Sequence, residues 1–480
     1  MKHLNKKIPL VFDLDGTLTQ TDCFWEAAVG LVTRHPTALP AFFLDILKTE
    51  KSKAGIKSVL VRYTDIGHRR VPIRPETLEL LLKAKADSRP RILCTGSPKL
   101  WADEFVKQIE ELTGVKKIFT KVLASTDTLN LIKEKKVLAL RQFYPEFDYV
   151  GNSTHDIPIW KAANTALFAG HCQKTKRLAA RHGIELQEIS PAPYAPSWSK
   201  ALRVHQWMKN FLIFVPVLSA HAYTNSVAVG TSLAAFIAFC LAASGNYLLN
   251  DSGDAGNDRA HPSKRTRPIA SGEISIPHAL LVAAALITSG IALAFFTSQT
   301  LGWVLISYLA TATFYSNKGK EIPILDTTIL AGLYCARIGA GSAATGIPIS
   351  SWLMATALFL FFSLALGKRD AELASNQKTH GRGYEADDRT SIAALGSASS
   401  IAAIVMLCLY TQSAEASDIY DKSPWLWALP TLGLFWASRF WLLCGRGLMK
   451  EDPVLWAAKD RTSWIVAGLV GASILLAKLT

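Results

Sequence analysis

The chain has 480 residues, half of them hydrophobic, and its 52 Lys and Arg against 38 Asp and Glu residues give a formal net charge of +14. This length permits two or more domains. No basic run with interleaved aromatic residues indicates a nucleic-acid surface. The seven scattered cysteines have neither CxxC pairs nor metal-ligand spacing, which argues against a disulfide framework or a zinc site. Apolar residues concentrate after residue 205, so we expect a soluble N-terminal half and a membrane-embedded C-terminal half.

The N-terminal half begins with a short apolar run at residues 8–12, which predicts a buried strand. Further strands are predicted at 91–94, 117–119 and 148–150, with a mostly helical pattern over 22–88 and helices between the later strands. This alternation predicts an α/β domain with a parallel sheet, whose ligands bind at the carboxyl ends of the strands. We place this Rossmann-like domain at residues 1–190, with a helical cap at about 22–88.

The first predicted strand is followed at once by the motif DLDGT, which supplies two carboxylates. Asp13 can attack a phosphorus atom, and Asp15, two residues on, can transfer a proton. Thr95 ends the second predicted strand, Lys136 begins a helix, and Asp156 closes the run GNSTHD after another strand. A metal-binding loop is the alternative interpretation of the first motif taken alone.

This order of motifs resembles the haloacid dehalogenase (HAD) phosphatase superfamily. The resemblance implies that Asp13 is the nucleophile and Asp15 the general acid/base, and that both contribute with Asp156 to a Mg²⁺ site. It also implies that Thr95 and Lys136 bind phosphate.

Two features leave alternatives open in this half. Asn152 stands where many superfamily members have an acid, so a regulatory HAD domain without catalysis remains an alternative. Lys133 and Lys135 are neighbours of Lys136, so the identity of the phosphate-binding lysine also remains open.

A proline-rich linker at residues 191–200 precedes about nine apolar spans, each near the roughly 20 residues that a bilayer requires. The spans lie near 208–222, 227–249, 277–296, 300–314, 325–345, 350–367, 393–412, 425–444 and 463–479. One set of loops is rich in Lys and Arg, whereas the alternating set holds essentially only Lys422. The positive-inside rule therefore predicts a multi-pass protein of the inner (plasma) membrane, with a cytoplasmic N-terminal domain and a bundle over residues 201–480.

The polar stretch NDSGDAGND follows the second span, and its acids are the most informative feature of the C-terminal half. Asn250, Asp254 and Asp258 recur every fourth residue and share one face of a helix, with Asp251 beside them. Acids at a membrane helix end are costly and favour a functional role. Mg²⁺, with phosphate oxygens completing its shell, is the usual way to hold them together. A capped, solvated helix end is the alternative.

Three cations follow this stretch and suit phosphate oxygens: Lys264, Arg265 and Arg267. The stretch resembles the first motif, NDxxDxxxD, of the UbiA superfamily of intramembrane prenyltransferases. Its continuation over 261–272 resembles one branch, the polyprenyl-phosphate phosphoribosyltransferases. The resemblance extends from about Trp198 to the C-terminus.

Other positions match the same branch. They are Lys209 within the run HQWMKN; Tyr315, Ser316, Lys320 and Asp326 of a YSxxLKxxxxLD pattern, in which Gly319 replaces the first Leu; and Arg337, Lys368 and Arg369. The resemblance implies that these residues bind substrate or phosphate, and that Asp326 is catalytic. Prenyl-diphosphate users carry a second DxxxD motif, whereas the position four after Asp326 is Leu330. Because an isolated charge inside a membrane helix is costly, Asp326 and Arg337 should each meet a ligand or a partner, and a structural Asp–Arg pair is the alternative.

The combined resemblance implies a Mg²⁺-dependent transfer of 5-phosphoribose from phosphoribosyl diphosphate (PRPP) to a polyprenyl phosphate at the cytoplasmic membrane face, in cell envelope biosynthesis. Asp254 and Asp258 would hold the departing diphosphate through the metal, and the HAD domain could then remove the 5-phosphate. One alternative is a UbiA-type transferase that moves a prenyl group from a prenyl diphosphate to an aromatic or other acceptor. Another is a membrane transporter or scaffold with a regulatory HAD module. The oligomeric state stays open.

Overall fold

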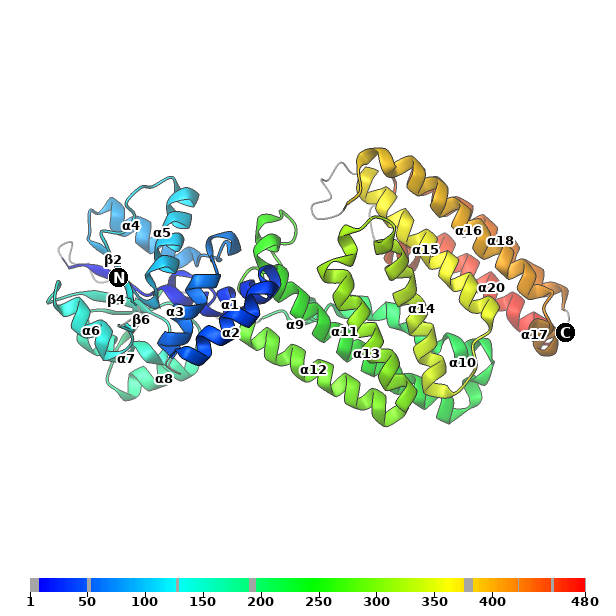
Figure 1. Cartoon of the computed structure of the whole chain (residues 1–480), viewed down its shortest axis with the longest axis horizontal. Helices are drawn as coiled ribbons and strands as arrows, with labels where there is room; N and C mark the ends of the chain where they lie inside the picture. The colour runs from blue at the N-terminus through cyan, green and yellow to red at the C-terminus, as the bar shows by residue number, and fades with distance from the viewer. Residues whose placement is uncertain are drawn as a thin grey trace. The chain divides into compact units, whose positions relative to one another are not determined.

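The computed structural model describes residues 8–49, 53–126, 129–189, 196–374, 383–421, 423–449 and 453–479. The chain divides into two compact units, residues 1–202 with 247–284 and residues 203–246 with 285–480 (Figure 1). The boundary falls within helix α11 (Ser226–Ala260), so the acidic motif belongs to the first unit. Residues 191–195 of the predicted linker and the predicted loop cation Lys422 lie outside the described residues.

The first unit is built on a parallel sheet. Within the described residues it has six strands in the order β3-β2-β1-β4-β5-β6. The strands are β1 (Leu10–Phe12), β2 (Arg91–Pro98), β3 (Lys121–Ser125), β4 (Asp148–Gly151), β5 (Ala166–Phe168) and β6 (Leu186–Glu188). The α/β class and the parallel sheet are thereby confirmed.

The predicted strand at 117–119 is wrong, because β3 begins four residues later. Lys117 has a φ of 52°, a left-handed conformation that interrupts an extended chain. The sequence interpretation also missed β5 and β6, which are three residues long and show too little periodicity to be recognised.

Helices cover both faces of the sheet, and β1 shows why. Leu10 and Phe12 belong to one hydrophobic core, whereas Val11 belongs to the other, as the alternation of side chains along a strand requires. The first core includes residues of α1 (Cys23–Arg34), α3 (Lys53–Tyr63), α4 (Pro75–Ala86) and α5 (Lys99–Thr113); the second includes residues of α6 (Glu134–Arg141) and α7 (Ile157–Ala162). Helices α2 (Leu39–Lys48) and α8 (Gln173–Arg181) complete the set. The segment between β1 and β2 is largely helical, as predicted.

The rest of the described chain is helical. After α9 (Trp198–Ala201) come a 3-10 segment at Val204–Phe214, α10 (Val215–Ser219), α11, and α12 (Ile276–Thr297). They are followed by α13 (Gln299–Asn317), α14 (Leu325–Thr345), α15 (Ser351–Ala374), α16 (Arg389–Thr411), α17 (Ala414–Tyr420), α18 (Ala428–Gly445), α19 (Pro453–Lys459) and α20 (Arg461–Leu479).

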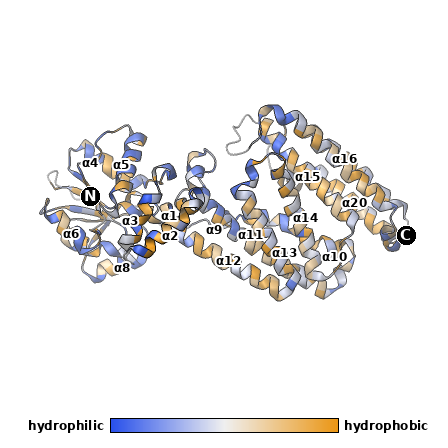
Figure 2. Cartoon of the chain, viewed as in Figure 1, coloured by the Kyte–Doolittle hydropathy of each residue, from blue (hydrophilic) through white to orange (hydrophobic). Residues whose placement is uncertain are grey.

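Five helical segments of the described chain are long and apolar enough to cross a membrane: Ser226–Ala260, Ile276–Thr297, Ser351–Ala374, Ala386–Thr411 and Arg461–Leu479. Figure 2 shows their hydrophobic stretches, for example in α12, α16 and α20. The predicted number of about nine spans is not confirmed. The first predicted span, 208–222, is a 3-10 segment followed by a five-residue helix, whose second residue, Pro216, cannot donate a backbone hydrogen bond. Polar residues such as Asp326 and Arg337 lower the hydropathy of α14.

Candidate active sites

The carboxyl end of β1 positions the two acids of the first motif. Asp13 follows Phe12 directly, and its backbone N–H donates to the carbonyl of Val150 in β4. Asp15 is held by two donors: the Ser97 hydroxyl lies 2.6 Å from its Oδ2, and the Cys23 backbone nitrogen lies 2.9 Å from its Oδ1. Neighbouring strands of the sheet therefore fix both carboxylates at one edge, as expected for a parallel sheet.

A buried network links Asp13 to Lys136 and Asp156. The Lys136 ammonium donates to Asp13 Oδ1 at 2.7 Å and to the Tyr149 hydroxyl at 3.0 Å. That hydroxyl donates in turn to Asp156 Oδ1 at 2.9 Å. The structure therefore places Lys136, rather than Lys133 or Lys135, against the first acid.

Burial and the neighbouring charges act on this network in opposite directions. Burial raises the pKa of Asp13 to about 7, and the charge of Lys136 opposes that rise. For Lys136, burial alone would lower the pKa, but the charges of Asp13 and Asp156 outweigh it and raise the pKa overall. Lys136 is therefore a buried cation whose charge depends on its two acidic neighbours.

Asp13, Asp15, Lys136 and Asp156 all line one cavity of about 750 Å³. The sequence predicted that Thr95 of β2 would line this cavity. Among the described residues, its neighbour Gly96 lines the cavity and Thr95 does not. Thr95 is fully buried, and its Oγ1 accepts from the Ser97 backbone nitrogen. Thr95 therefore does not form part of the cavity wall, and its predicted phosphate-binding role stays a prediction.

The cavity also has walls that the sequence interpretation missed. Phe24 and Trp25 of α1 and Ile56 of α3 make part of it apolar, and Lys57 of α3 adds a cation. Ser275, the residue before α12, lines it as well. No short motif marks these positions in the sequence. They come from the helical cap and from residues 247–284, which are distant in sequence from the acids.

The acids of this cavity suit Mg²⁺, which prefers oxygen ligands. Asp156 Oδ2 accepts from the backbone nitrogens of Asn152 and Ser153 at 3.0 and 2.9 Å, so this carboxylate is held in place. A Cβ atom at Gly151 would lie 2.8 Å from Asp156 Cγ, so glycine is required beside it. Among the described residues, no group of three or more His, Cys, Asp or Glu side chains is arranged to hold a metal ion. Waters or substrate phosphate would therefore supply much of the coordination, which is usual for Mg²⁺.

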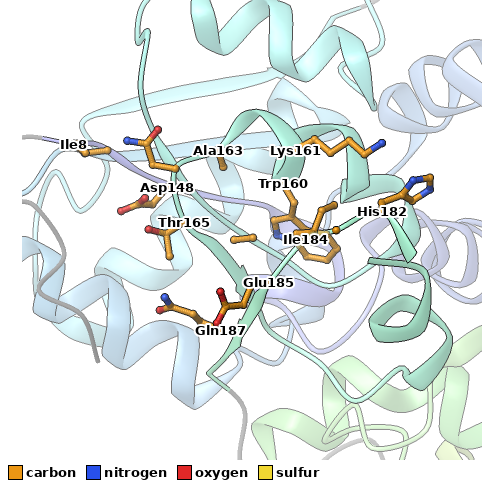
Figure 3. A pocket seen from close by; sticks show the side chains of 13 residues that line it. Ile8, Asp148, Trp160, Lys161, Ala163, Thr165, His182, Ile184, Glu185 and Gln187 are labelled. Carbon is orange, nitrogen blue, oxygen red and sulfur yellow. The ribbon is translucent and has the colours of Figure 1, made fainter. Parts of the chain in front are cut away.

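A second cavity, of about 600 Å³, is lined by residues at the opposite, amino-terminal ends of the strands (Figure 3). Asp148 and Thr165 contribute to it beside His182 and Glu185. The Asp148 carboxylate forms an ion pair with Arg89. None of the predicted site residues lines this cavity.

The acidic motif occupies the last turns of α11. Asp251 and Asp258 are buried, whereas Asn250 and Asp254 are partly exposed. Arg267 joins the two buried acids: its Nη1 lies 3.1 Å from Asp251 Oδ1 and 2.7 Å from Asp258 Oδ2. The loop after α11 thus places the Arg267 guanidinium against two acids of the motif. Lys264 and Arg265 of the same loop are exposed.

In the second unit, Asp326 is fully buried at the start of α14. Its Oδ2 lies 2.6 Å from Arg369 Nε of α15, and its Oδ1 accepts from the Tyr384 hydroxyl. A second nitrogen of Arg369 donates to the Tyr315 hydroxyl at 3.3 Å. Three of the predicted residues, Asp326, Arg369 and Tyr315, are therefore brought together.

Arg337 forms a different group. Its Nε donates to Asn210 Oδ1 at 2.9 Å, and an Nη nitrogen donates to the Tyr308 hydroxyl at 2.7 Å. The Lys209 ammonium lies 5.7 Å from the centre of the Tyr334 ring, which Arg337 also faces. The arginine that pairs with Asp326 is thus Arg369, whereas Arg337 donates to neutral groups. Lys320 lies in the 3-10 turn Gly319–Glu321, and Lys368 lies beside Arg369 on α15.

Comparison with known proteins identifies a family for each part of the chain. The model of the UbiA prenyltransferase family matches residues 211–457, and the model of haloacid dehalogenase-like hydrolases matches residues 10–161. The chain belongs to the UbiA prenyltransferase family. It carries an N-terminal haloacid dehalogenase-like domain.

Three relatives show how far the similarity of this UbiA-family chain extends. The uncharacterized protein y4nM of Sinorhizobium fredii is 32% identical over 486 residues, which cover 98% of this chain and 92% of that protein. Nodulation protein NoeC of Azorhizobium caulinodans is 34% identical over 56% of this chain and 89% of its own length. Decaprenyl-phosphate phosphoribosyltransferase of Corynebacterium glutamicum is 36% identical over 193 residues, 39% of this chain and 58% of that enzyme.

Proposed function

We propose that this UbiA-family protein transfers 5-phosphoribose from PRPP to a polyprenyl phosphate at the cytoplasmic membrane face, and that its HAD domain then removes the 5-phosphate. Both steps act on phosphate groups and share one lipid. The membrane location accords with the apolar helices, and the cytoplasmic face is inferred from the loop charges.

The transferase step is supported by the acids and cations at the end of α11. Asp254 and Asp258, four residues apart on one helix, are suited to a Mg²⁺ ion, which would bind and neutralise the diphosphate. In the proposed step, a lipid phosphate oxygen bonds to the anomeric carbon while the bond from that carbon to diphosphate breaks. Lys264 and Arg265 neutralise the phosphate oxygens, and Arg267 can exchange carboxylate for phosphate contacts. No protein nucleophile is needed, because positioning and charge neutralisation carry the step.

The choice of donor is supported by two observations. The relative from Corynebacterium glutamicum, named a decaprenyl-phosphate phosphoribosyltransferase, matches part of this chain. Asp326 is already paired with Arg369 and is followed four residues later by Leu330, so the second DxxxD motif of prenyl-diphosphate users is incomplete in this sequence. A site with one acidic motif and many cations suits phosphoribose transfer better than a site with two metal clusters.

The phosphatase step is supported by the Asp13 cavity. Asp13 attacks the phosphorus atom as the bond to the ribose 5-oxygen breaks, and Asp15 protonates that oxygen. Water then releases inorganic phosphate from the aspartyl phosphate, with Asp15 accepting the proton. Lys136 orients Asp13 and neutralises the phosphate.

The position of Ser275 is the observation that best supports two consecutive steps on one lipid. It lines the Asp13 cavity and immediately precedes Ile276, the first residue of α12, which is apolar and long enough to span a membrane. The cavity is thus bounded by the beginning of a membrane helix. A phosphate carried on a membrane lipid is a suitable substrate for such a cavity.

The second candidate is prenyl transfer from a prenyl diphosphate to an aromatic or other acceptor, which the match to the UbiA prenyltransferase family favours. Membranes containing the full chain should be incubated with Mg²⁺, polyprenyl phosphates and labelled PRPP, or with labelled prenyl diphosphate and 4-hydroxybenzoate. Labelled phosphoribosyl lipid in the first incubation supports the proposal. Label only in the aromatic product supports the second candidate.

A further inference from the structure

A buried group of one acid and two arginines connects the HAD cap to the acidic motif of α11. Glu26 of α1 is fully buried. Its Oε2 lies 2.9 Å from Arg69 Nε, and its Oε1 lies 2.7 Å from Arg259 Nη2. Arg259 directly follows Asp258, the last acid of the motif. All three residues belong to the first unit.

The remaining donors of Arg69 reach the backbone of the motif itself. Arg69 Nη1 donates to the Gly253 carbonyl at 2.9 Å, and Nη2 donates to the Ser252 carbonyl at 3.1 Å. The cap arginine therefore contacts the stretch between Asp251 and Asp254. A guanidinium that donates to three acceptors has little freedom to move.

Arg259 fixes the loop that follows the motif. Its Nε donates to the Ala270 carbonyl at 2.8 Å, and its Nη1 donates to the Arg69 carbonyl at 2.8 Å. Residues 261–270 are thereby closed into a loop, and this loop carries Arg267 to Asp251 and Asp258. The same acid thus supports both the helix and the loop of the metal motif.

Close backbone packing is a second, independent observation at the same place. A Cβ atom at Gly256 would lie 3.1 Å from Arg69 Cα and 3.3 Å from the His68 carbonyl oxygen. A Cβ atom at Gly253 would lie 3.0 Å from the Thr33 methyl group. Both glycines of the motif stretch face the cap, so α11 approaches it closely enough to require small residues.

Glu26 supplies the negative charge between the two buried guanidinium groups of Arg69 and Arg259. Burial alone would raise its pKa, but Arg259 and Arg69 outweigh burial and lower the pKa, which keeps Glu26 ionised. Without this carboxylate, two buried guanidinium groups would face each other, and α11 would have to move away from the cap to relieve the repulsion. The position of the motif acids therefore depends on a residue of the HAD half.

We propose that Glu26 is a positioning residue for the transferase: through Arg69 and Arg259, the HAD cap holds the acidic motif of α11 in its working geometry. This inference rests on the proposed transfer reaction. It gives the fusion a structural reason apart from consecutive catalysis, because the transferase would need the HAD fold even when the phosphatase is inactive.

The test uses the full-length protein in membranes and compares E26Q, E26D and G256A with wild type. The matched control is E79Q, which removes an exposed carboxylate of α4. Phosphoribosyl transfer should fall on the order of 10- to 100-fold in E26Q and G256A, mainly in kcat, and E26D should recover much of it because it keeps the charge. Half-saturating Mg²⁺ should rise in E26Q. Hydrolysis of p-nitrophenyl phosphate at Asp13 should persist, which shows that the HAD domain is folded.

Backbone hydrogen exchange over residues 250–260 measures the positioning directly. It should become faster in E26Q and G256A and stay unchanged in E79Q. Unchanged exchange, or faster exchange with wild-type transfer, would overturn the inference. If E26Q does not accumulate in membranes, G256A decides the matter by the same two measurements. A wild-type chain that transfers nothing from PRPP contradicts the proposed function, and the exchange result then decides the positioning role alone.

Discussion

The Lys136 ammonium lies 2.7 Å from Asp13 Oδ1, although 123 residues separate the two in sequence. Both side chains are buried, and both line the cavity that Ser275 also borders. The contact orients the carboxylate and keeps a cation beside any phosphate that reaches it. The same unit also carries the acidic motif of α11.

The charge of Lys136 should set the pH dependence of phosphatase activity. Because Lys136 lowers the pKa of Asp13, its removal in K136M should raise that pKa further above about 7. The attacking group is the carboxylate, so activity rises with pH, and K136M should shift this rise to higher pH with roughly 100-fold slower hydrolysis. The measurement is the pH–rate profile on p-nitrophenyl phosphate, with the exposed neighbour variant K135M as the control. A pH–rate profile that does not shift in K136M would show that Lys136 does not control the ionisation of Asp13.

The acids of α11 should be required for transfer. D254N and D258N each remove one negative ligand for Mg²⁺ and should lower lipid labelling about 100-fold or more, while the protein remains in the membrane. D418N, at an exposed position of α17, should behave like wild type. Labelling from PRPP with saturating Mg²⁺ measures the effect. Near-normal turnover in either motif variant would show that the metal site lies elsewhere.

The orientation of the chain can be tested with introduced cysteines. In a background without the exposed Cys172, S263C after α11 should react with a membrane-impermeant maleimide only from the cytoplasmic side. D418C should react only from the opposite side. The reverse pattern would place the motif loop outside the compartment expected for the HAD domain.

Donor preference follows from the neighbourhood of Asp326. With Arg369 on its carboxylate and Leu330 in place of a second acid, the site should prefer PRPP with polyprenyl phosphate over prenyl diphosphate with 4-hydroxybenzoate. Introducing the missing acid in L330D should not increase aromatic prenylation if the lipid phosphate is the true acceptor. Efficient prenylation by wild type, without any phosphoribosyl lipid, would favour the prenyltransferase alternative.

Residues that lie next to strand ends or within helical repeats could be predicted from the sequence. The apolar run 8–12 and the motif after it located β1, Asp13 and Asp15, and the i, i+4 spacing placed Asn250, Asp254 and Asp258 on one helix. These signals are local, because strand alternation and helical periodicity act over a few residues.

Pairings between distant residues could not be predicted. Glu26 and Arg259 are 233 residues apart, and only the presence of an acid within the apolar run of α1 hints that Glu26 needs a buried partner. The pairing of Arg369 with Asp326 is a contact that the sequence does not predict, and the substrate role of Arg369 stays a prediction. The short strands β5 and β6 form because they extend an existing sheet, which single-sequence periodicity does not report.

The most direct test of the central claim is the ratio of two lipids formed by wild type and by D13N. Membranes with the full chain receive PRPP, polyprenyl phosphate and Mg²⁺, and mass spectrometry separates the phosphoribosyl lipid from its dephosphorylated form, which is lighter by one phosphate. Wild type should give mainly the dephosphorylated lipid. D13N, which loses the attacking carboxylate, should keep transfer but accumulate the phosphorylated lipid, and the exposed control D103N should match wild type. Equal ratios in wild type and D13N would contradict the account.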